Sequence, residues 1–448
     1  MGCETSRKGC RCAHILVMQA RQEAYICPMS FDWRLVLLAI AGLKLAAPAP
    51  VAAQGPGPSL RQLLRQDTTG LSRVLAQPKA YRLQILYTRI SRDAAGQPHF
   101  RTSGYRLRPR EYFYPASTVK LAGAALALEK LRALRAQVPA LTPDSPMLTD
   151  SAFAGQTRVR RDTSSASGRP TLRNYVRKAL LVSDNDAYNR LYEFVGPADL
   201  NAGLARLGLR HSRLQHRLSV GDGEPATRHT NPIAFFADTA ATQLLHRQSA
   251  GFYAGPWPRL GLHGEGVGRA HMQGARQVAG PLDLSQKNAF ALPDLQRLLR
   301  IVLFPETVPA ARRLHLEPED YAMLREAMSQ LPRESPHPRY DVAHYPDTYV
   351  KFLLGGGGTT PLPSGVRVFN KIGQAYGFLI DNAYVVDAEK GVEFLLSAVV
   401  YVNADGVLND DKYEYDTVGF PFLRDLGRRV YEAECRRAAG RKPGQLPR

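Results

Sequence analysis

Strand-like patterns stand near both ends of this 448-residue chain, with helical patterns between them. Residues 83–107 predict a hairpin, because strand patterns flank a turn signal at 93–96. Residues 366–371, 378–387 and 392–402 are also predicted as strands, and the last is almost continuously apolar. The pattern predicts an α/β (α+β) fold: an antiparallel sheet formed by both chain ends with flanking helices, plus an inserted all-helical domain.

The expected domain boundaries follow this order of elements. Residues 1–53 are expected to be a leader and signal peptide, residues 54–116 and 345–448 the α/β sheet domain, and residues 117–344 the helical domain. Within the last, residues 240–290 contain many glycines and are predicted to be an insertion.

Between the strand patterns, apolar residues recur at the three- and four-residue spacing of amphipathic helices. Thr171 precedes one such run and is a suitable N-cap. The predicted helices cover residues 172–180, a following run to 194, 199–207, 232–245, 293–304 and 317–331, with a C-terminal helix around 423–431.

A serine precedes a lysine by three residues where another helical pattern begins, at Ser117 and Lys120. Residues three apart on a helix share a face. A serine hydroxyl needs an adjacent base to act as a nucleophile. A lysine serves as that base if burial or nearby cations lower its pKa. Taken alone, this pair is better explained as a surface serine and lysine at a helix start, so the chemical interpretation needs partners.

Two further short motifs follow, Ser183-Asp184-Asn185 at a junction between helical patterns and Lys371-Ile372-Gly373 in an extended run. Each has an ordinary structural explanation, because Ser, Asp and Asn cap helices and lysine is common at strand edges. Together, in the order SxxK, SDN, KxG, they resemble the motifs of the serine β-lactamases and penicillin-binding proteins. The SDN motif points to the class A branch, and the resemblance covers about residues 80–435.

The resemblance implies acyl transfer to a serine. Ser117 would attack a carbonyl and Lys120 would accept its proton. The backbone N–H groups of Ser117 and Gln374 would stabilise the oxyanion. Ser183 would relay a proton to the leaving nitrogen. No metal or other cofactor is implied.

The same resemblance implies a set of substrate-binding residues. Lys371 would keep the electrostatic field near Ser183 positive, and Asn185 would bind the amide side chain of the substrate. The predicted binding residues are Asn185, Lys371, Gly373 and Gln374.

The chain departs from the family pattern in two places. Ile372 stands where the family usually has a threonine or serine that helps to hold the substrate carboxylate. The loop over residues 210–232 lacks the family's Glu-x-x-Leu-Asn stretch, and Glu224 is a weak substitute for its catalytic glutamate. Without a base for the hydrolytic water, an acyl-enzyme should accumulate.

Three interpretations of function remain open. The first is a β-lactamase-like serine hydrolase acting on a β-lactam or a related cyclic or peptide amide. The second is a D-alanyl-D-alanine peptidase or another serine amidase or esterase that uses the same motifs. The third is a penicillin-binding sensor with slow turnover. A GxSxG elbow, typical of other serine hydrolases, is absent from the sequence.

The net charge of +19 raises the possibility of nucleic-acid binding. The basic residues are dispersed, however, and no basic cluster is interleaved with aromatics. A small-molecule substrate, β-lactam or peptidoglycan-like, and a monomer are expected instead. The glycine-rich stretch 261–266 is not a phosphate loop, and His263 and His271 are more often solvated than metal ligands.

Residues 35–53 are apolar and small, and they end in Val51-Ala52-Ala53, which is typical of a signal-peptidase site. Lys44, the nearby prolines and the short apolar core argue against a membrane anchor. Translation starts at Met1 or at Met29, since the first 28 residues suit an n-region poorly. Beyond the leader, Cys435 is the only cysteine, so no intrachain disulfide is expected there. The protein is therefore expected to be exported, periplasmic or secreted in a bacterium, without a stable membrane span after processing.

We predict that the mature protein begins near Gln54, because the apolar stretch ends in small residues at Val51–Ala53. The N-terminus of protein purified from a bacterial envelope fraction can be determined by mass spectrometry. Finding the intact leader on that material would contradict the prediction.

Overall fold

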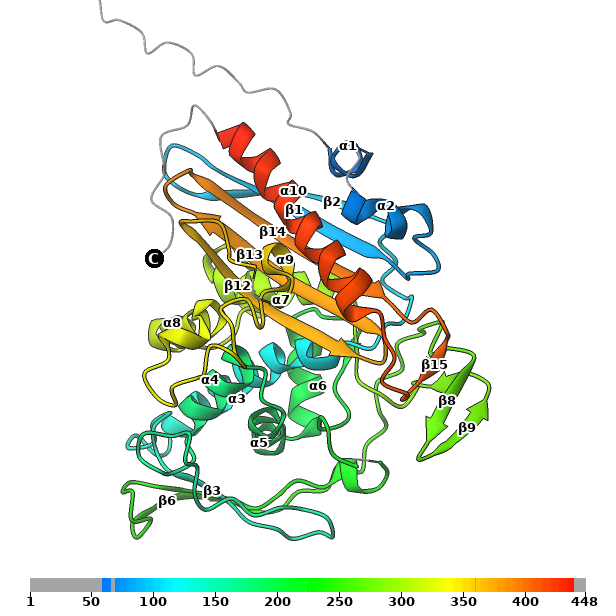
Figure 1. The fold of residues 1–448 in the computed structure, drawn as a ribbon. Helices are drawn as coiled ribbons and strands as arrows, with labels where there is room; N and C mark the ends of the chain where they lie inside the picture. Colours follow the sequence, from blue (N-terminus) through cyan, green and yellow to red (C-terminus); the bar gives the residue numbers. More distant parts are fainter. Residues whose placement is uncertain (1–58, 66–68, 222, 359, 439–448) are drawn as a thin grey trace, which may run out of the picture. The chain divides into compact units, whose positions relative to one another are not determined.

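The computed structural model describes residues 59–65, 69–221, 223–358 and 360–438. Its main element is a five-stranded sheet in the order β12–β13–β14–β1–β2, and all of its pairings are antiparallel (Figure 1). The strands are β1 Gln84–Arg92, β2 Pro98–Tyr105, β12 Val366–Ala375, β13 Phe378–Asp387 and β14 Val392–Tyr401. The predicted sheet formed by both ends of the chain is confirmed.

The pairing of β1 with β14 joins the two ends of the chain. Ile85 lies opposite Ala398, and Arg89 lies opposite Phe394. Strands β13 and β14 are buried at every position, which is typical of strands covered on both faces. Strand β12 forms one edge of the sheet, and this edge faces the functional site described below.

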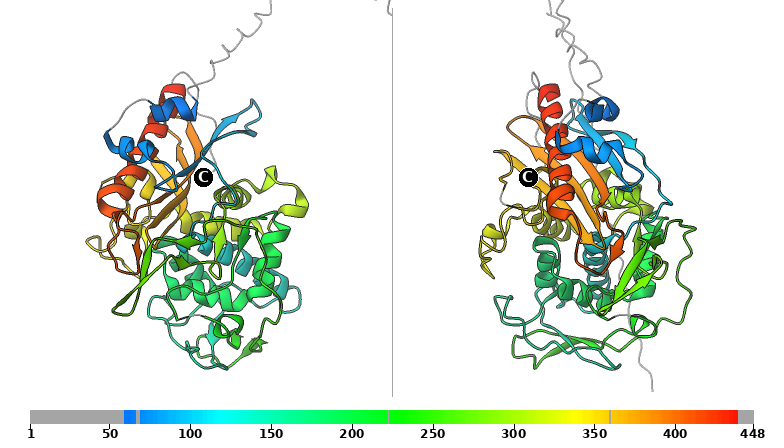
Figure 2. Two further views of the ribbon diagram at one scale, coloured as in Figure 1. Left: turned by 90° about the vertical axis from the view of Figure 1, so that its right-hand side faces the viewer. Right: turned by 45° about the vertical axis from the view of Figure 1, so that its right-hand side comes forward.

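Helices cover both faces of the sheet (Figure 2). The C-terminal helix α10 crosses one face, where Phe422, Leu426 and Val430 pack in an apolar cluster with residues of β1, β13 and β14. The helices on this face are α1 Leu60–Arg65, α2 Thr69–Ala76 and α10 Phe420–Ala438. Helix α7 packs against β1, β13 and β14 on the other face, where Leu295, Leu299 and Val302 join a second cluster.

The segment between β2 and β12 is mainly helical. Its helices are α3 Lys120–Arg135, α4 Leu172–Leu181, α5 Asn185–Val195, α6 Pro197–Arg206, α7 Leu292–Leu303, α8 Pro318–Ser329 and the short α9 Phe352–Gly355. Thr171 is the N-cap of α4, because its side chain accepts a hydrogen bond from the backbone N–H of Asn174 at 3.1 Å. These bounds match the predicted helices over 172–180, 199–207, 293–304 and 317–331 to within a few residues.

The helix predicted over residues 232–245 is wrong. This segment forms β5 Ile233–Phe236 and β6 Leu244–Gln248, which pair with each other and, through β5, with β3 Met147–Thr149. The side chain of Asp238 accepts hydrogen bonds from the backbone N–H groups of Thr242 and Gln243 and so holds a turn between the two strands. An aspartate that binds its own local backbone competes with helix formation.

The inserted region is consequently not entirely helical. Residues 240–290 contain β6 and the short strands β7 Gly266–Val267, β8 Ala270–Gln273, β9 Arg276–Ala279, β10 Leu282–Asp283 and β11 Ala289–Phe290. Strand β8 also pairs with β15 Val407–Leu408, and β11 pairs with β4 Ser212–Arg213. Through the pairing of β8 with β15, the glycine-rich stretch therefore contacts the segment that follows β14.

The predicted leader, its cleavage site and the candidate start at Met29 lie outside the described residues. In the described part of the chain, no helix is both long and apolar enough to cross a membrane.

Gly427→Ala should destabilise the protein, because a Cβ at this position would lie 2.7 Å from the backbone nitrogen of Leu354. Alanine favours a helix over glycine by about 1 kcal/mol, but overpacking costs about 1–3 kcal/mol. We expect a net loss of up to about 2 kcal/mol in the free energy of unfolding, measured by chemical denaturation. Gly221→Ala is the matched control, since nothing lies within 4 Å of its Cβ position. Equal stability of the two variants would contradict this account of the packing.

Candidate active site

Ser117 lies in a short 3-10 turn, Ala116–Val119, that leads directly into α3 at Lys120. Strand β12 packs closely against this turn. A Cβ on Gly373 would lie 2.6 Å from the carbonyl oxygen of Pro115, so the approach requires glycine. Ser117 is half-buried, whereas Lys120 is buried. The serine is thus accessible from one side only.

The Lys120 ammonium group is held by the second motif. Its Nζ donates hydrogen bonds to Asn185 Oδ1 at 2.7 Å, to Ser183 Oγ at 3.2 Å and to the backbone oxygen of Ser183. Burial lowers the pKa of Lys120 to about 7, although Asp184 partly opposes the shift. A lysine with this pKa is partly neutral near pH 7 and can accept a proton.

A second lysine reaches the same hydroxyl from β12. Lys371 Nζ donates to Ser183 Oγ at 2.8 Å and to the carbonyl oxygen of Ile372 at 3.1 Å. Burial lowers the pKa of Lys371 well below its usual value, and the positive charge of Lys120 lowers it further. Because a hydroxyl has two acceptor lone pairs, Ser183 can accept from both lysines and still donate its own proton.

The Ser183–Asn185 segment has both structural and chemical roles. Asp184 caps α5 by accepting from the backbone N–H of Ala187 at 2.7 Å. Ser183 has φ +59, in the left-handed region that non-glycine residues seldom occupy. Such backbone strain is concentrated at functional sites. Asn185 Nδ2 donates to Ser219 Oγ at 2.8 Å and so connects the motif to the 216–220 loop.

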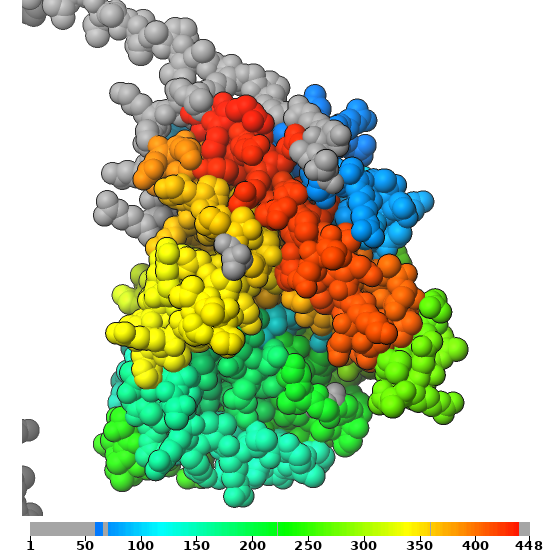
Figure 3. Space-filling view, in the orientation of Figure 1, coloured from blue at the N-terminus to red at the C-terminus, as the bar shows by residue number. Residues whose placement is uncertain are grey.

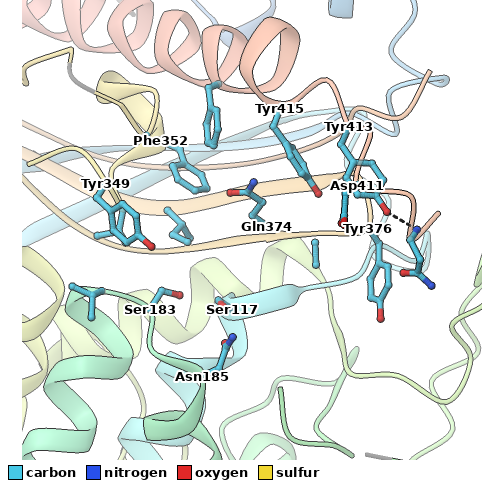
Figure 4. Close-up of a pocket in the computed structure, with 17 residues that line it drawn as sticks. Ser117, Ser183, Asn185, Tyr349, Phe352, Gln374, Tyr376, Asp411, Tyr413 and Tyr415 are labelled. Carbon is cyan, nitrogen blue, oxygen red and sulfur yellow. Dashed lines mark hydrogen bonds between the residues drawn. The ribbon is translucent and has the colours of Figure 1, made fainter. Parts of the chain in front are cut away.

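A cavity of about 610 Å³ opens from Ser117 along the edge of β12. The space-filling view shows a hollow where the yellow and orange segments meet the green and cyan ones (Figure 3). Aromatic side chains line one side of the cavity, opposite Ser117, Ser183 and Asn185 (Figure 4). We call this set the aromatic wall: Tyr349, Phe352, Tyr376, Tyr413, Tyr415 and Phe420.

A smaller cavity of about 210 Å³ shares Ser117, Asn185 and Gln374 with the first. Its remaining lining includes His216, Arg217, Ser219 and Lys287. Lys287 comes from the predicted insertion, so this segment contributes directly to the surroundings of Ser117. The structure therefore brings together Ser117, Lys120, Ser183, Asn185, Lys371, Gly373 and Gln374.

Glu224 is not part of this assembly. Arg228 Nε donates to one oxygen of its carboxylate at 2.8 Å, and Trp257 Nε1 donates to the other at 2.9 Å. Glu224 lines neither of the two cavities that Ser117 lines. These contacts point to a structural role in the loop rather than to activation of water at the serine.

A buried polar cluster that was not predicted from the sequence lies behind β12. Lys351 Nζ donates to Asn370 Oδ1, and Asn370 Nδ2 donates to Asp381 Oδ1, both at 2.7 Å. Burial lowers the pKa of Lys351 and raises that of Asp381. Asn370 and Lys371 are consecutive, so their side chains lie on opposite faces of the sheet. The only sequence signal was an asparagine and a lysine side by side in a predicted strand.

The aromatic wall also went unrecognised in the sequence, because its members come from separate segments around 349–352, 376 and 413–420. No local spacing connects these segments. Among the described residues, no group of three or more His, Cys, Asp or Glu side chains could hold a metal ion.

Comparison with known proteins finds a family match over part of the chain. A model of the beta-lactamase enzyme family matches residues 92–250, which contain Ser117, Lys120 and the Ser183–Asn185 segment. The match confirms the predicted superfamily of serine β-lactamases and penicillin-binding proteins. No curated protein matches the chain.

Similar solved structures include a beta-lactamase from Desulfarculus baarsii, with 18% identity over 81% of this chain and 95% of that chain and a TM-score of 0.42. A beta-lactamase from Xanthomonas campestris pv. campestris has 15% identity over 81% and 96% of the two chains, with a TM-score of 0.43. The protein PBP-A has 16% identity over 85% and 98%, with a TM-score of 0.44.

We predict that Lys120 loses its proton near pH 7, because burial lowers its pKa to about 7. An ordinary lysine titrates about three units higher. The ε-carbon resonance of Lys120, labelled with ¹³C and assigned by its absence in Lys120→Met, should shift with a midpoint near neutrality. The prediction would be wrong if the Lys120 resonance kept the chemical shift of the protonated form above pH 9. Burial would then not destabilise the charged ammonium group.

Proposed function

Since the chain is a serine hydrolase of the β-lactamase and penicillin-binding protein superfamily, we propose that it forms an acyl-enzyme at Ser117 with a β-lactam or a related cyclic or peptide amide. The observation that carries this proposal is the Ser183 hydroxyl, which accepts hydrogen bonds from both Lys120 and Lys371. This arrangement connects Lys120, three residues after Ser117, to Lys371 through one hydroxyl that can pass a proton to the leaving group.

In the first step, neutral Lys120 removes the proton from the Ser117 hydroxyl as its oxygen attacks the amide carbonyl. The backbone N–H groups of Ser117 and Gln374 stabilise the oxyanion of the tetrahedral intermediate. When the C–N bond breaks, Ser183 delivers a proton to the nitrogen and is reprotonated from the lysines. The products of this step are an ester at Ser117 and an amine, which stays attached to the acyl group when the amide is cyclic and leaves when it is a peptide amide.

In the second step, water must attack the ester, and this water needs a base. Glu224 is engaged by Arg228 and Trp257. Of the described carboxylates, only Asp411 lines either cavity, and it lies beside Tyr376 and Tyr413 of the aromatic wall (Figure 4). A general base contributes about 10²–10⁴-fold to such a step. We therefore propose that deacylation is slow and that the acyl-enzyme accumulates.

The aromatic wall favours a substrate that places an apolar or aromatic substituent in the larger cavity. Tyrosine and phenylalanine rings offer large contact areas with little loss of side-chain freedom. Ile372, which also lines this cavity, adds apolar surface where the family usually has a hydroxyl. Ile372 thus offers apolar contact in place of the hydroxyl with which the family motif helps to hold the substrate carboxylate.

We also propose that the protein acts outside the cytoplasm, as an exported monomer with a small-molecule β-lactam or peptidoglycan-like substrate. The signal-peptide pattern supports export. A D-alanyl-D-alanine peptidase uses the same first step, so the choice between the two functions depends on which amide reacts and on how long the ester survives.

The decisive experiment follows the intact mass of the protein over time after mixing with benzylpenicillin. We expect one covalent adduct to form as a rapid burst and then to decline slowly, because acylation has its lysine base and hydrolysis lacks a carboxylate. Ser117→Ala should form no adduct, since it lacks the attacking oxygen. Glu224→Gln should match the wild type in both phases, because the Glu224 carboxylate is bound elsewhere.

Ser219→Ala is the matched control, because it removes another hydroxyl from the smaller cavity without removing the nucleophile. It should still be labelled. An undiminished adduct on Ser117→Ala would overturn the assignment of the nucleophile. Rapid steady-state hydrolysis without a burst would overturn the proposal of slow deacylation. A stable adduct with no measurable loss would favour the sensor interpretation.

A further inference from the structure

A separate cavity of about 430 Å³ lies beside β1, β2 and β14, away from the β12 edge of the sheet. Residues of β1, β2 and β14 form its floor, α7 forms one wall, and residues 307–312 form another. It shares no lining residue with the two cavities at Ser117. An occupant of this cavity would therefore not compete directly with a substrate at the serine.

Aliphatic side chains from the floor and the walls make up much of the cavity lining. Its aliphatic lining consists of Leu86, Leu107, Leu207, Ile301, Val308 and Leu395. The polar groups among them are satisfied within the protein: Thr88 Oγ1 donates to Gln296 Oε1 at 2.6 Å, and Gln296 Nε2 donates to Ser397 Oγ at 2.9 Å. Because these groups already have partners, the floor favours hydrocarbon over a polar ligand.

The lining also includes three arginines, Arg297, Arg300 and Arg312. Arg297 and Arg312 converge over Gly208, where a Cβ would lie 3.4 Å from each of their side chains. The Arg300 guanidinium lies 3.8 Å from the ring centre of Phe100 and donates to Thr307 Oγ1 at 3.3 Å.

None of these three arginines forms an ion pair with any residue in the described part of the chain. Glu306 is the acidic neighbour that acts on Arg300, and burial together with the charge of Arg297 lowers the pKa of Arg300. The other nearby carboxylate, Asp294, accepts hydrogen bonds from the backbone of His211 and from Ser212 Oγ. Positive charge therefore exceeds negative charge around this cavity.

We propose that this cavity binds a single-chain amphipathic anion, a fatty-acid carboxylate. The acyl chain would lie along the apolar floor, and the carboxylate would pair with Arg297 and Arg312. Arginine suits this role, because its planar fork matches the two oxygens of a carboxylate. The site does not depend on acyl transfer at Ser117.

Isothermal titration of the full chain with dodecanoate, below its micelle concentration, tests the proposal. We expect binding that strengthens up to about four-fold for each methylene from octanoate to dodecanoate, as expected for burial of apolar surface. The double variant Arg297→Gln/Arg312→Gln should bind at least ten-fold more weakly. Arg101→Gln, which changes an exposed arginine on β2, is the matched control and should bind as the wild type does.

A second variant tests the floor independently of the charge. Val308→Trp places a large ring in the half-buried wall and should weaken dodecanoate binding while the arginines remain. Dodecyltrimethylammonium, which has the same chain and the opposite charge, should bind far more weakly. Thermal melting of each variant confirms that it is folded.

Three results would overturn the proposal. The first is absence of dodecanoate binding to the wild type, or equal binding to the double arginine variant. The second is loss of binding after Ser117 has been acylated with benzylpenicillin, which would place the fatty acid in the serine cavity. The third is binding to phosphatidylglycerol vesicles without binding to free dodecanoate, which would identify a membrane surface as the ligand.

Discussion

Two buried lysines share one serine hydroxyl, and the chemistry of the site depends on this arrangement. Lys120 and Lys371 both donate to Ser183 Oγ, at 3.2 and 2.8 Å. Two ammonium groups cannot both stay charged at low cost in a dry site, so burial and mutual repulsion favour the neutral form of at least one. The site thereby obtains a base near neutral pH without a histidine.

The fold serves mainly to bring three distant segments to this hydroxyl. The turn before α3 supplies Ser117, and the first residue of α3 is Lys120. The junction of α4 and α5 supplies Ser183, and β12 supplies Lys371. Two local features fix the distances. Gly373 lets the strand approach the turn, and the left-handed backbone of Ser183 aims its side chain between the two lysines. The sheet itself is held by the pairing of β1 with β14, so both ends of the described chain are needed to position one edge strand.

Much of this arrangement could be predicted from the sequence, because the information is local. The SxxK, SDN and KxG motifs contain the proposed nucleophile and its proposed proton-transfer partners, and alternation and helical spacing mark the strands and most of the helices. The aromatic wall could not be predicted, since its rings come from separate segments that only the tertiary fold brings together. The helix predicted over residues 232–245 is wrong because an apolar run with helical spacing does not show that Asp238 will form a turn between two strands. Glu224 is a carboxylate in the right loop, but the local sequence does not show that its side chain accepts hydrogen bonds from Arg228 and Trp257.

The position of β12 at the edge of the sheet has a consequence for the behaviour of the protein in solution. An edge strand is a template for pairing with a second molecule, and such pairing leads to aggregation unless the edge is obstructed. Here the obstruction is the turn that carries Ser117, which is pressed against Gly373 so closely that no side chain fits between them. The turn that carries Ser117 therefore also shields this part of the edge strand. Substitutions that loosen it would be expected to lower solubility as well as the proposed activity, which links the geometry around Ser117 to the colloidal stability of the molecule.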